Sequence, residues 1–479
     1  MNPIRLFSTL LLMVLTTTAP IGTGWAQSAA YPSPAETAAP AATTVPAAAP
    51  ASPAQPAAQP QGQAVKDLLQ VLDLVLRNEP GLAAAQSARQ AAAAGVDVAF
   101  GARLPQLSAA GSIASQQTRN VGSADMATTP REGALALRQA LFRGGGLLAA
   151  EDAAKANADA AAAAEEETER QLLLTTASTF YELIRAKQVV KLNSTTQTVI
   201  AEQLRQTDLA FSVGQLTSTD VAQAKARLAS IEAELSAANS RLSAAESTYQ
   251  ALTGEPAAEM LDRPLQELLL PLPDLLAIAA KEHPRIQQNQ AKLLAARHAL
   301  QQAEAERYPS LDATASAGYQ NDVSSKDREA TVYRGGLSLT MPLYTGGSTT
   351  GRIAVARANQ DQAERLLRQS ERQVAQEVSR VWHELASNRV QQNAFTAAVT
   401  AADRALKGVR EEAQYGQRTT LDVLNAEREL LNAQVGLVQA ETGVRLSNLG
   451  LRAAIGRLSR RQLGDLLAEG MGNASAPKL

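Results

Sequence analysis

The feature that most constrains this chain is an internal duplication of roughly 200 residues. A shift of 204 places the Arg-Leu-Pro at 103–105 on the Arg-Tyr-Pro at 307–309. A shift of 202 places the Leu-Phe-Arg-Gly-Gly at 141–145 on the Leu-Tyr-Thr-Gly-Gly at 343–347. This period is too long for a solenoid repeat, so the chain must consist of two copies of one larger unit.

Both copies predict the same order of elements: a helix, a β-hairpin and a very long helical hairpin. The first helix ends at the Pro of each Arg-x-Pro, because the residue before proline is pushed out of helical geometry. The expected ranges in the first copy are 66–103 for the helix, 107–118 and 133–142 for the strands, and 147–212 and 217–252 for the helical hairpin. Those in the second copy are 274–306, 311–320, 334–344, 348–414 and 419–455.

The long helical hairpins are predicted from the absence of proline and from seven-residue spacing. No proline occurs between 131 and 255 or between 343 and 476. Apolar residues recur every seven positions in each returning helix: Val221, Leu228, Leu235, Leu242 and Tyr249, then Val423, Leu430, Leu437, Val444 and Leu451. A seven-residue period predicts left-handed supercoiling. A second apolar stripe beside the one that starts at Val423 predicts that this helix has neighbouring helices on two sides, as in a curved wall of helices.

The strands alternate apolar with small or polar residues, which predicts two chemically different faces. In the second copy Leu337, Leu339 and Met341 alternate with Ser338 and Thr340. Such hairpins fit an outer-membrane β-barrel, whose strands have about 9–11 residues. Four strands cannot close a barrel, since the smallest single-chain barrels have eight, so copies of the chain would have to pool their strands. The alternative is that the hairpins cap a soluble helical domain.

The remaining segments predict export and connection. Residues 1–26 have the short positive region, apolar run and small-x-small end of a signal peptide. Residues 27–63 are rich in Ala and Pro, which predicts an extended, disordered tether. We expect a first repeat over 64–254, a linker over 255–273, a second repeat over 274–456 and a tail over 457–479.

Together these motifs resemble the TolC-like outer membrane factor family. The resemblance covers residues 64–456 and includes the Tyr-Gly-Gln-Arg-Thr-Thr-Leu-Asp-Val-Leu-Asn-Ala run at 415–426. It implies an α+β membrane protein: a homotrimer with a twelve-stranded β-barrel in the outer-membrane lipid of a Gram-negative bacterium, continuous with an α-helical barrel in the periplasm. It also implies two partners, a periplasmic adaptor (membrane fusion) protein and an inner-membrane ABC or proton-driven transporter.

The resemblance also places a gate where the long helices turn back, at Gly214 and Gly416. In the family an Arg–Asp bridge holds the helix ends closed, and the matching positions are Arg418 and Asp220, with Thr219 beside Asp220. The alternative for these residues is ordinary turn and N-cap chemistry, because a carboxylate is favoured near a helix start anyway.

Two further positions match the family's lumen constriction. Asp422 matches a lumen-facing aspartate, and threefold symmetry would make it an anionic ring. Asn425 stands where the family has a second aspartate, so the ring should be less negative. Ala413 stands where the family has the tyrosine of the latch, so that contact is in doubt.

No catalytic chemistry is predicted. The three histidines match no metal spacing, and no phosphate-binding loop or nucleophile motif occurs, so we expect neither an enzyme nor a cofactor or metal. A net charge of −2 argues against nucleic acid as a partner. The resemblance implies an export channel whose cargo is drugs, metals or protein. The absence of cysteine excludes an acylated amino-terminal Cys and favours type I protein secretion, with a toxin as one candidate. The alternative function is a periplasmic coiled-coil structural protein without a pore.

Overall fold

The computed structural model describes residues 66–118, 126–262, 266–321, 328–459 and 462. The expected signal peptide over 1–26, the tether over 27–63 and most of the tail over 457–479 lie outside the described residues. Contacts divide the chain into Met1–Gln59 and Pro60–Leu479. Everything described below belongs to the second unit.

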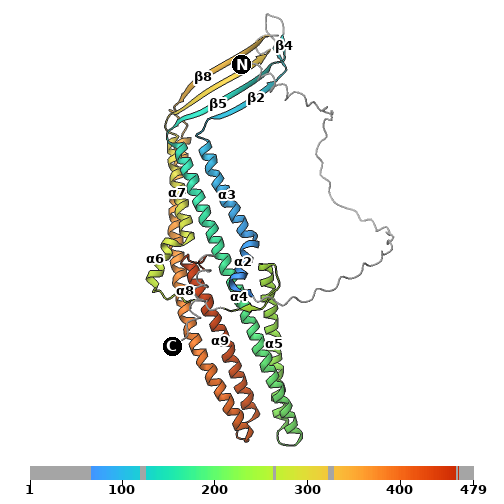
Figure 1. Cartoon of the computed structure of the whole chain (residues 1–479). Helices are drawn as coiled ribbons and strands as arrows, with labels where there is room; N and C mark the ends of the chain where they lie inside the picture. The colour runs from blue at the N-terminus through green and yellow to red at the C-terminus, as the bar shows by residue number, and fades with distance from the viewer. Residues whose placement is uncertain (1–65, 119–125, 263–265, 322–327, 460–461, 463–479) are drawn as a thin grey trace, which may run out of the picture. The chain divides into compact units, whose positions relative to one another are not determined.

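The same order of elements occurs twice along this unit (Figure 1). The first series is α2 (Leu68–Asn78), α3 (Pro80–Gly101), β2 (Gln106–Ile113), β5 (Arg131–Arg143), α4 (Gly146–Ser212) and α5 (Ser218–Thr253). The second is α6 (Leu272–Glu282), α7 (Pro284–Ala305), β7 (Ser310–Asn321), β8 (Glu329–Thr340), α8 (Ser348–Gln414) and α9 (Thr420–Ala454). Two small pairs complete it: β1 (Lys66–Asp67) with β6 (Met260–Leu261), and β3 (Gln116–Thr118) with β4 (Met126–Thr128).

The expected single helices over 66–103 and 274–306 were wrong, because each is broken into two. Pro80 and Pro284 occupy the first positions of α3 and α7, where proline costs no hydrogen bond. The residue before each proline is extended and caps the new helix. The Glu79 carboxylate accepts from the backbone N–H of Gly81, and His283 Nδ1 accepts from that of Arg285 at 3.1 Å.

The strand bounds also differ from those expected. The first strand ends at Ile113 and is followed by the short β3, and β8 ends at Thr340 rather than at 344. The segment between the expected strands 107–118 and 133–142 contains β4 and the start of β5, while 119–125 lie outside the described residues. The four long helices, by contrast, lie within one residue of their expected bounds.

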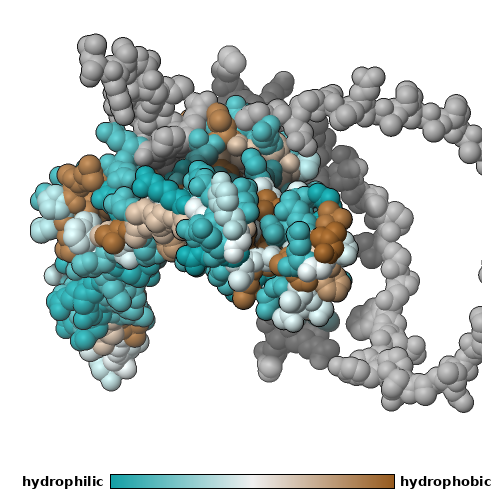
Figure 2. Space-filling model, turned by 90° about the horizontal axis from the view of Figure 1, so that it is seen from below, coloured by the Kyte–Doolittle hydropathy of each residue, from teal (hydrophilic) through white to brown (hydrophobic). Residues whose placement is uncertain are grey.

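The helices pack in the order α3–α4–α7–α8, and α5 and α9 return beside α4 and α8. Three glycines of α9 at seven-residue spacing face three side chains of α8. A Cβ on Gly436, Gly443 or Gly450 would meet Phe395, Asn388 or Val381, at 2.3, 3.0 and 3.4 Å. Because these glycines have no side chain, α8 and α9 can pack closely. Seen from below, the surface is mostly hydrophilic, with small separate hydrophobic patches (Figure 2). In the described part of the chain, no helix is both long and apolar enough for a bilayer crossing.

The heptad pattern of α5 determines which residues it buries. Its deepest stripe is Ala224, Ile231, Ala238 and Ala245, spaced seven apart. This stripe lies three residues after the expected one, whose members Val221 and Tyr249 are also buried. The two stripes together are the a and d positions of a supercoiled helix pair.

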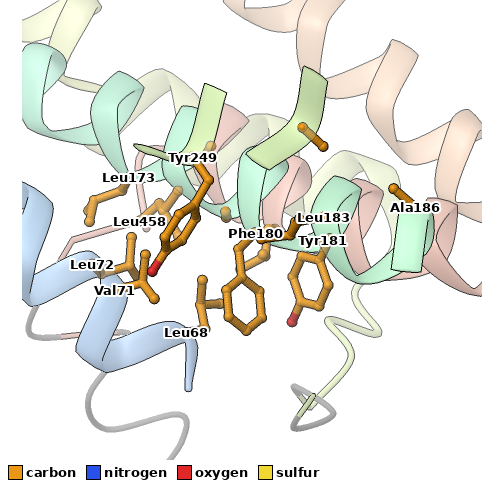
Figure 3. Packing of buried hydrophobic residues seen from close by; sticks show 14 residues of the cluster. Leu68, Val71, Leu72, Leu173, Phe180, Tyr181, Leu183, Ala186, Tyr249 and Leu458 are labelled. Carbon is orange, nitrogen blue, oxygen red and sulfur yellow. The ribbon is translucent and has the colours of Figure 1, made fainter. Parts of the chain in front are cut away.

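Three aromatic residues gather where α2 packs on α4 and α5. Phe180, Tyr181 and Tyr249 are at most 2% exposed and lie among aliphatic side chains of the cluster in Figure 3. The rings of Phe180 and Tyr181 meet edge to face at 5.4 Å. Burying such large side chains contributes most to a core that is otherwise rich in alanine.

The main sheet is antiparallel with the order β2-β5-β7-β8, so the pairing of β5 with β7 joins the two repeats. In one row, Leu107 lies opposite Leu137, and Leu137 lies opposite Ala315. In the next, Ala313 lies opposite Leu337. Apart from a bulge between Ala140 and Phe142 of β5, the register is unbroken, so the four strands turn most of their apolar residues to one face and polar or small ones to the other. The apolar face is open, with Leu337 71% and Leu339 70% exposed. Within the described residues, β2 and β8 are free edges of this sheet.

Candidate functional site at the tips of the helical hairpins

The two helical hairpins turn back at tips of the same geometry, residues 213–217 and 415–419. Gly214 and Gly416 have φ of 77° and 72°, a left-handed conformation in which glycine alone is unstrained. The backbone N–H of Gln215 donates to Ala210 O at 2.9 Å, and that of Gln417 to Glu412 O at 2.9 Å. These bonds satisfy carbonyls at the end of each outgoing helix. The expected turns at both glycines are therefore found.

Asp220 and Asp422 each complete a capping box at the start of the returning helix. Asp220 Oδ2 accepts from the backbone N–H of Thr217 at 2.9 Å and from its hydroxyl at 2.7 Å. Asp422 Oδ2 accepts in the same way from Thr419, at 3.0 and 2.8 Å. These hydrogen bonds lower the pKa of both carboxyl groups below the usual value. The capping alternative is thus present at both tips.

Arg418 precedes Asp422 by four residues but pairs with Glu412. Its Nε donates to the Glu412 carboxylate at 2.7 Å, and this bond raises the pKa of Arg418. Among the described residues of the single chain, no ion pair joins Arg418 to Asp220. Thr219 is exposed in the first turn of α5. The latch between these residues therefore remains a proposal.

Two contacts near the tips were not expected from the sequence. Arg410 of α8 pairs with Glu427 of α9, whose carboxylate is buried. Arg227 of α5 donates through Nη2 to Asn425 Oδ1 of α9 at 2.9 Å. Arg227 follows Asp220 by seven residues, so the heptad period does place both on one face of α5. The sequence gives no signal for the partner on the other helix.

The two tips differ in their exposed side chains. Near the first tip, Leu209, Phe211 and Val213 are 45–69% exposed. The shift of 202 matches Leu209 and Phe211 with Glu411 and Ala413. Val213 matches Tyr415, which is 82% exposed, so the first tip exposes three apolar side chains at positions where the second exposes only Tyr415, on a lower surface that is otherwise mostly hydrophilic (Figure 2).

Comparison with known proteins gives a family match and distant relatives. The model of the family described as outer membrane efflux protein matches residues 71–255 and 275–457. The outer membrane efflux protein BepC of Brucella suis is 29% identical over 294 residues, 61% of this chain and 64% of that protein. The outer membrane protein TolC of Escherichia coli is 28% identical over 309 residues, 61% of this chain and 62% of that protein. The matched stretch thus spans less than two thirds of either relative.

A solved structure has the same fold. The CmeC outer membrane channel of Campylobacter jejuni superposes with a TM-score of 0.74 at 20% identity, covering 84% of this chain and 89% of that one.

Proposed function

Because this chain belongs to the outer membrane efflux protein family, we propose that it is a gated export channel of the outer membrane of a Gram-negative bacterium. In this proposal three copies pool their four strands into a twelve-stranded barrel, and their helices continue it into the periplasm as a tube. The observation that carries the proposal is the four-stranded sheet, which has an open apolar face, a polar face and two free edges. In lipid, unpaired backbone groups at such edges cost several kcal/mol each, so the edges must meet those of other copies.

The duplication supplies the register of the seam between copies. Within the chain, Leu137 of β5 lies opposite Ala315 of β7. The duplication matches Leu137 with Leu339, by the shift of 202, and Ala315 with Gly111, by the shift of 204. We therefore propose that Leu339 of β8 lies opposite Gly111 of β2 in the next copy, with the hydrogen-bond pattern that joins β5 to β7.

A cysteine pair tests this seam without background, because the chain contains no cysteine. Gly111→Cys combined with Leu339→Cys is expected to give a covalent trimer on a non-reducing gel. Opposed residues in an antiparallel pair lie about 4.5–5.5 Å apart at Cα, a distance that a disulfide spans. The control, Ser112→Cys with Leu339→Cys, places the two thiols on opposite faces and should stay monomeric after denaturation. Equal cross-linking of both pairs, or of neither, would contradict the register.

We further propose that the tips form the gate, with Arg418 meeting Asp220 and Thr219 in the assembled trimer, and with Asp422 and Asn425 at the lumen constriction. Each contact is weak, since an exposed ion pair contributes at most about 1 kcal/mol. A weak latch suits a gate, because a partner that binds the open tips better can shift the equilibrium.

The latch predicts a leakier channel when either charge is removed. Arg418→Gln and Asp220→Asn should each raise the conductance of trimers in planar bilayers, by up to about fivefold if the pair contributes 1 kcal/mol. Asp220→Asn keeps a side-chain oxygen that can accept from the backbone N–H of Thr217, the N-cap residue, so the capping box is preserved. As a control, Arg205→Gln removes an exposed arginine that pairs with Glu202 of its own helix. Wild-type conductance in both latch variants would exclude this role.

The partners in this proposal are a periplasmic adaptor and an energised inner-membrane transporter of the ABC or proton-driven class. The chain itself performs no catalysis and needs no cofactor. For cargo we propose protein of a type I secretion system, with small-molecule efflux as the second candidate. Deleting the gene and measuring both the secreted proteins and the drug tolerance of the cells separates the two. A protein found only in the soluble periplasm would instead support the coiled-coil alternative.

A further inference from the structure

The hydrogen bond from Arg227 to Asn425 connects the two repeats near their tips. Its donor lies on α5 of the first helical hairpin, and its acceptor lies on α9 of the second. In the halves of α5 and α9 nearest the tips, no other side-chain hydrogen bond between these two helices occurs among the described residues. Asn425 follows Asp422 by three residues, so the bond lies about one helical turn from the capping box.

This bond lies beside an apolar seam that holds the same helices together. Ala224 and Ile231 of α5 are buried with Leu424 and Leu431 of α9, and Ile200 of α4 covers them. Arg227 stands between the first two in sequence, and Asn425 directly follows Leu424. The seam fixes the helices side by side but is non-directional. The hydrogen bond is directional, so it forms only at one position of α5 along the axis of α9.

We propose that Arg227 and Asn425 form a clasp that keeps α5 against α9 in the closed channel, so that Arg227 is a positioning residue of the gate. The inference rests on the proposed function as a gated channel. In this proposal Asn425 does not replace the second aspartate of the family's lumen ring, because its side-chain oxygen accepts a hydrogen bond from Arg227. An uncharged acceptor gives a weaker bond than a carboxylate would, which keeps the clasp reversible.

The duplication predicts that the clasp forms at the seam within each chain and not at the seam between copies. The shift of 202 matches Arg227 with Glu429 and Asn425 with Gln223. The equivalent seam between copies would therefore place a glutamate near a glutamine, without a guanidinium group. Three clasps per trimer would then alternate with three seams of different chemistry.

Two substitutions in the full-length trimer, recorded in planar bilayers, test the clasp in opposite directions. Arg227→Gln should raise the open probability by about three- to tenfold, the change expected for one ordinary hydrogen bond. Asn425→Asp should lower it below wild type in dilute salt, because the bond becomes an ion pair. In about 1 M KCl that difference should fade, because the screening length shrinks to about 3 Å.

Lys225→Gln, which removes an exposed positive charge two residues away on α5, is the matched control and should behave as wild type. A charge added to a lumen ring would change ion selectivity without tightening the gate. An open probability of Asn425→Asp at or above wild type would therefore overturn the clasp, as would wild-type gating in Arg227→Gln. The wild-type trimer is recorded in the same experiment. If it conducts, either of these two outcomes contradicts the clasp and not the proposed channel. A non-conducting wild type would contradict the proposed channel itself.

Discussion

Replacing Leu337 and Leu339 together by lysine is expected to remove nearly all of the protein from the outer membrane. Both side chains are about 70% exposed on the apolar face of β8. A lysine on the lipid face of a barrel costs about 2–4 kcal/mol at the midplane of the bilayer and less near its surface. Three copies each carry both substitutions, so six lysines together cost up to about 24 kcal/mol, against a stability of about 5–15 kcal/mol for a typical folded domain.

The matched control for this pair is Ser338→Lys, between the two leucines in sequence but on the polar face of the same strand. It should leave the amount of trimer in the outer-membrane fraction near that of wild type. Heat-modifiable trimer on a gel, measured in isolated outer membranes, reports both results. A double lysine variant that still inserts as a trimer would show that this face does not meet lipid.

Gly144→Ala is expected to cost about 3 kcal/mol of stability, through backbone strain and overpacking together. Gly144 has a φ of 60°. A Cβ there would lie 2.7 Å from the carbonyl oxygen of Ala305, at the end of α7, and 2.7 Å from Cβ of Tyr308, in the turn that follows. The neighbouring Gly145 has a φ of 83° but nothing within 4 Å, so Gly145→Ala adds strain alone. Thermal unfolding followed by circular dichroism should rank Gly144→Ala clearly below Gly145→Ala, and equal loss would contradict the clash.

The second repeat turns this comparison into a test of assembly. Gly346 has the same φ of 60° as Gly144, yet nothing lies within 4 Å of its added Cβ in the single chain. The duplication matches Ala305 and Tyr308, the neighbours of Gly144, with Gly101 and Leu104. In the trimer, Gly101 and Leu104 of a second copy would therefore lie next to Gly346. Gly346→Ala should therefore lower the temperature at which the trimer dissociates more than it disturbs the helices of each chain.

Much of the local structure was readable from the sequence. The four long helices follow from proline-free stretches, and both hairpin tips follow from glycines that must adopt positive φ. The breaks at Pro80 and Pro284 also have a sequence signal, because the shift of 204 places Pro80 on Pro284. The alanine-rich pattern runs through each proline without a gap, but the proline begins a new helix.

The sequence alone showed the duplication. It also determined the type and order of the long elements and the two-faced strands, because these depend on patterns among residues close together in the chain. Only the tertiary structure decided that β5 pairs with β7, that Arg418 meets Glu412, and that Arg227 reaches Asn425 198 residues away. A local pattern fixes which face of a helix or strand a side chain occupies. Its partner on another element depends on how far the two elements slide and rotate when their apolar faces pack, and that is set by the whole fold.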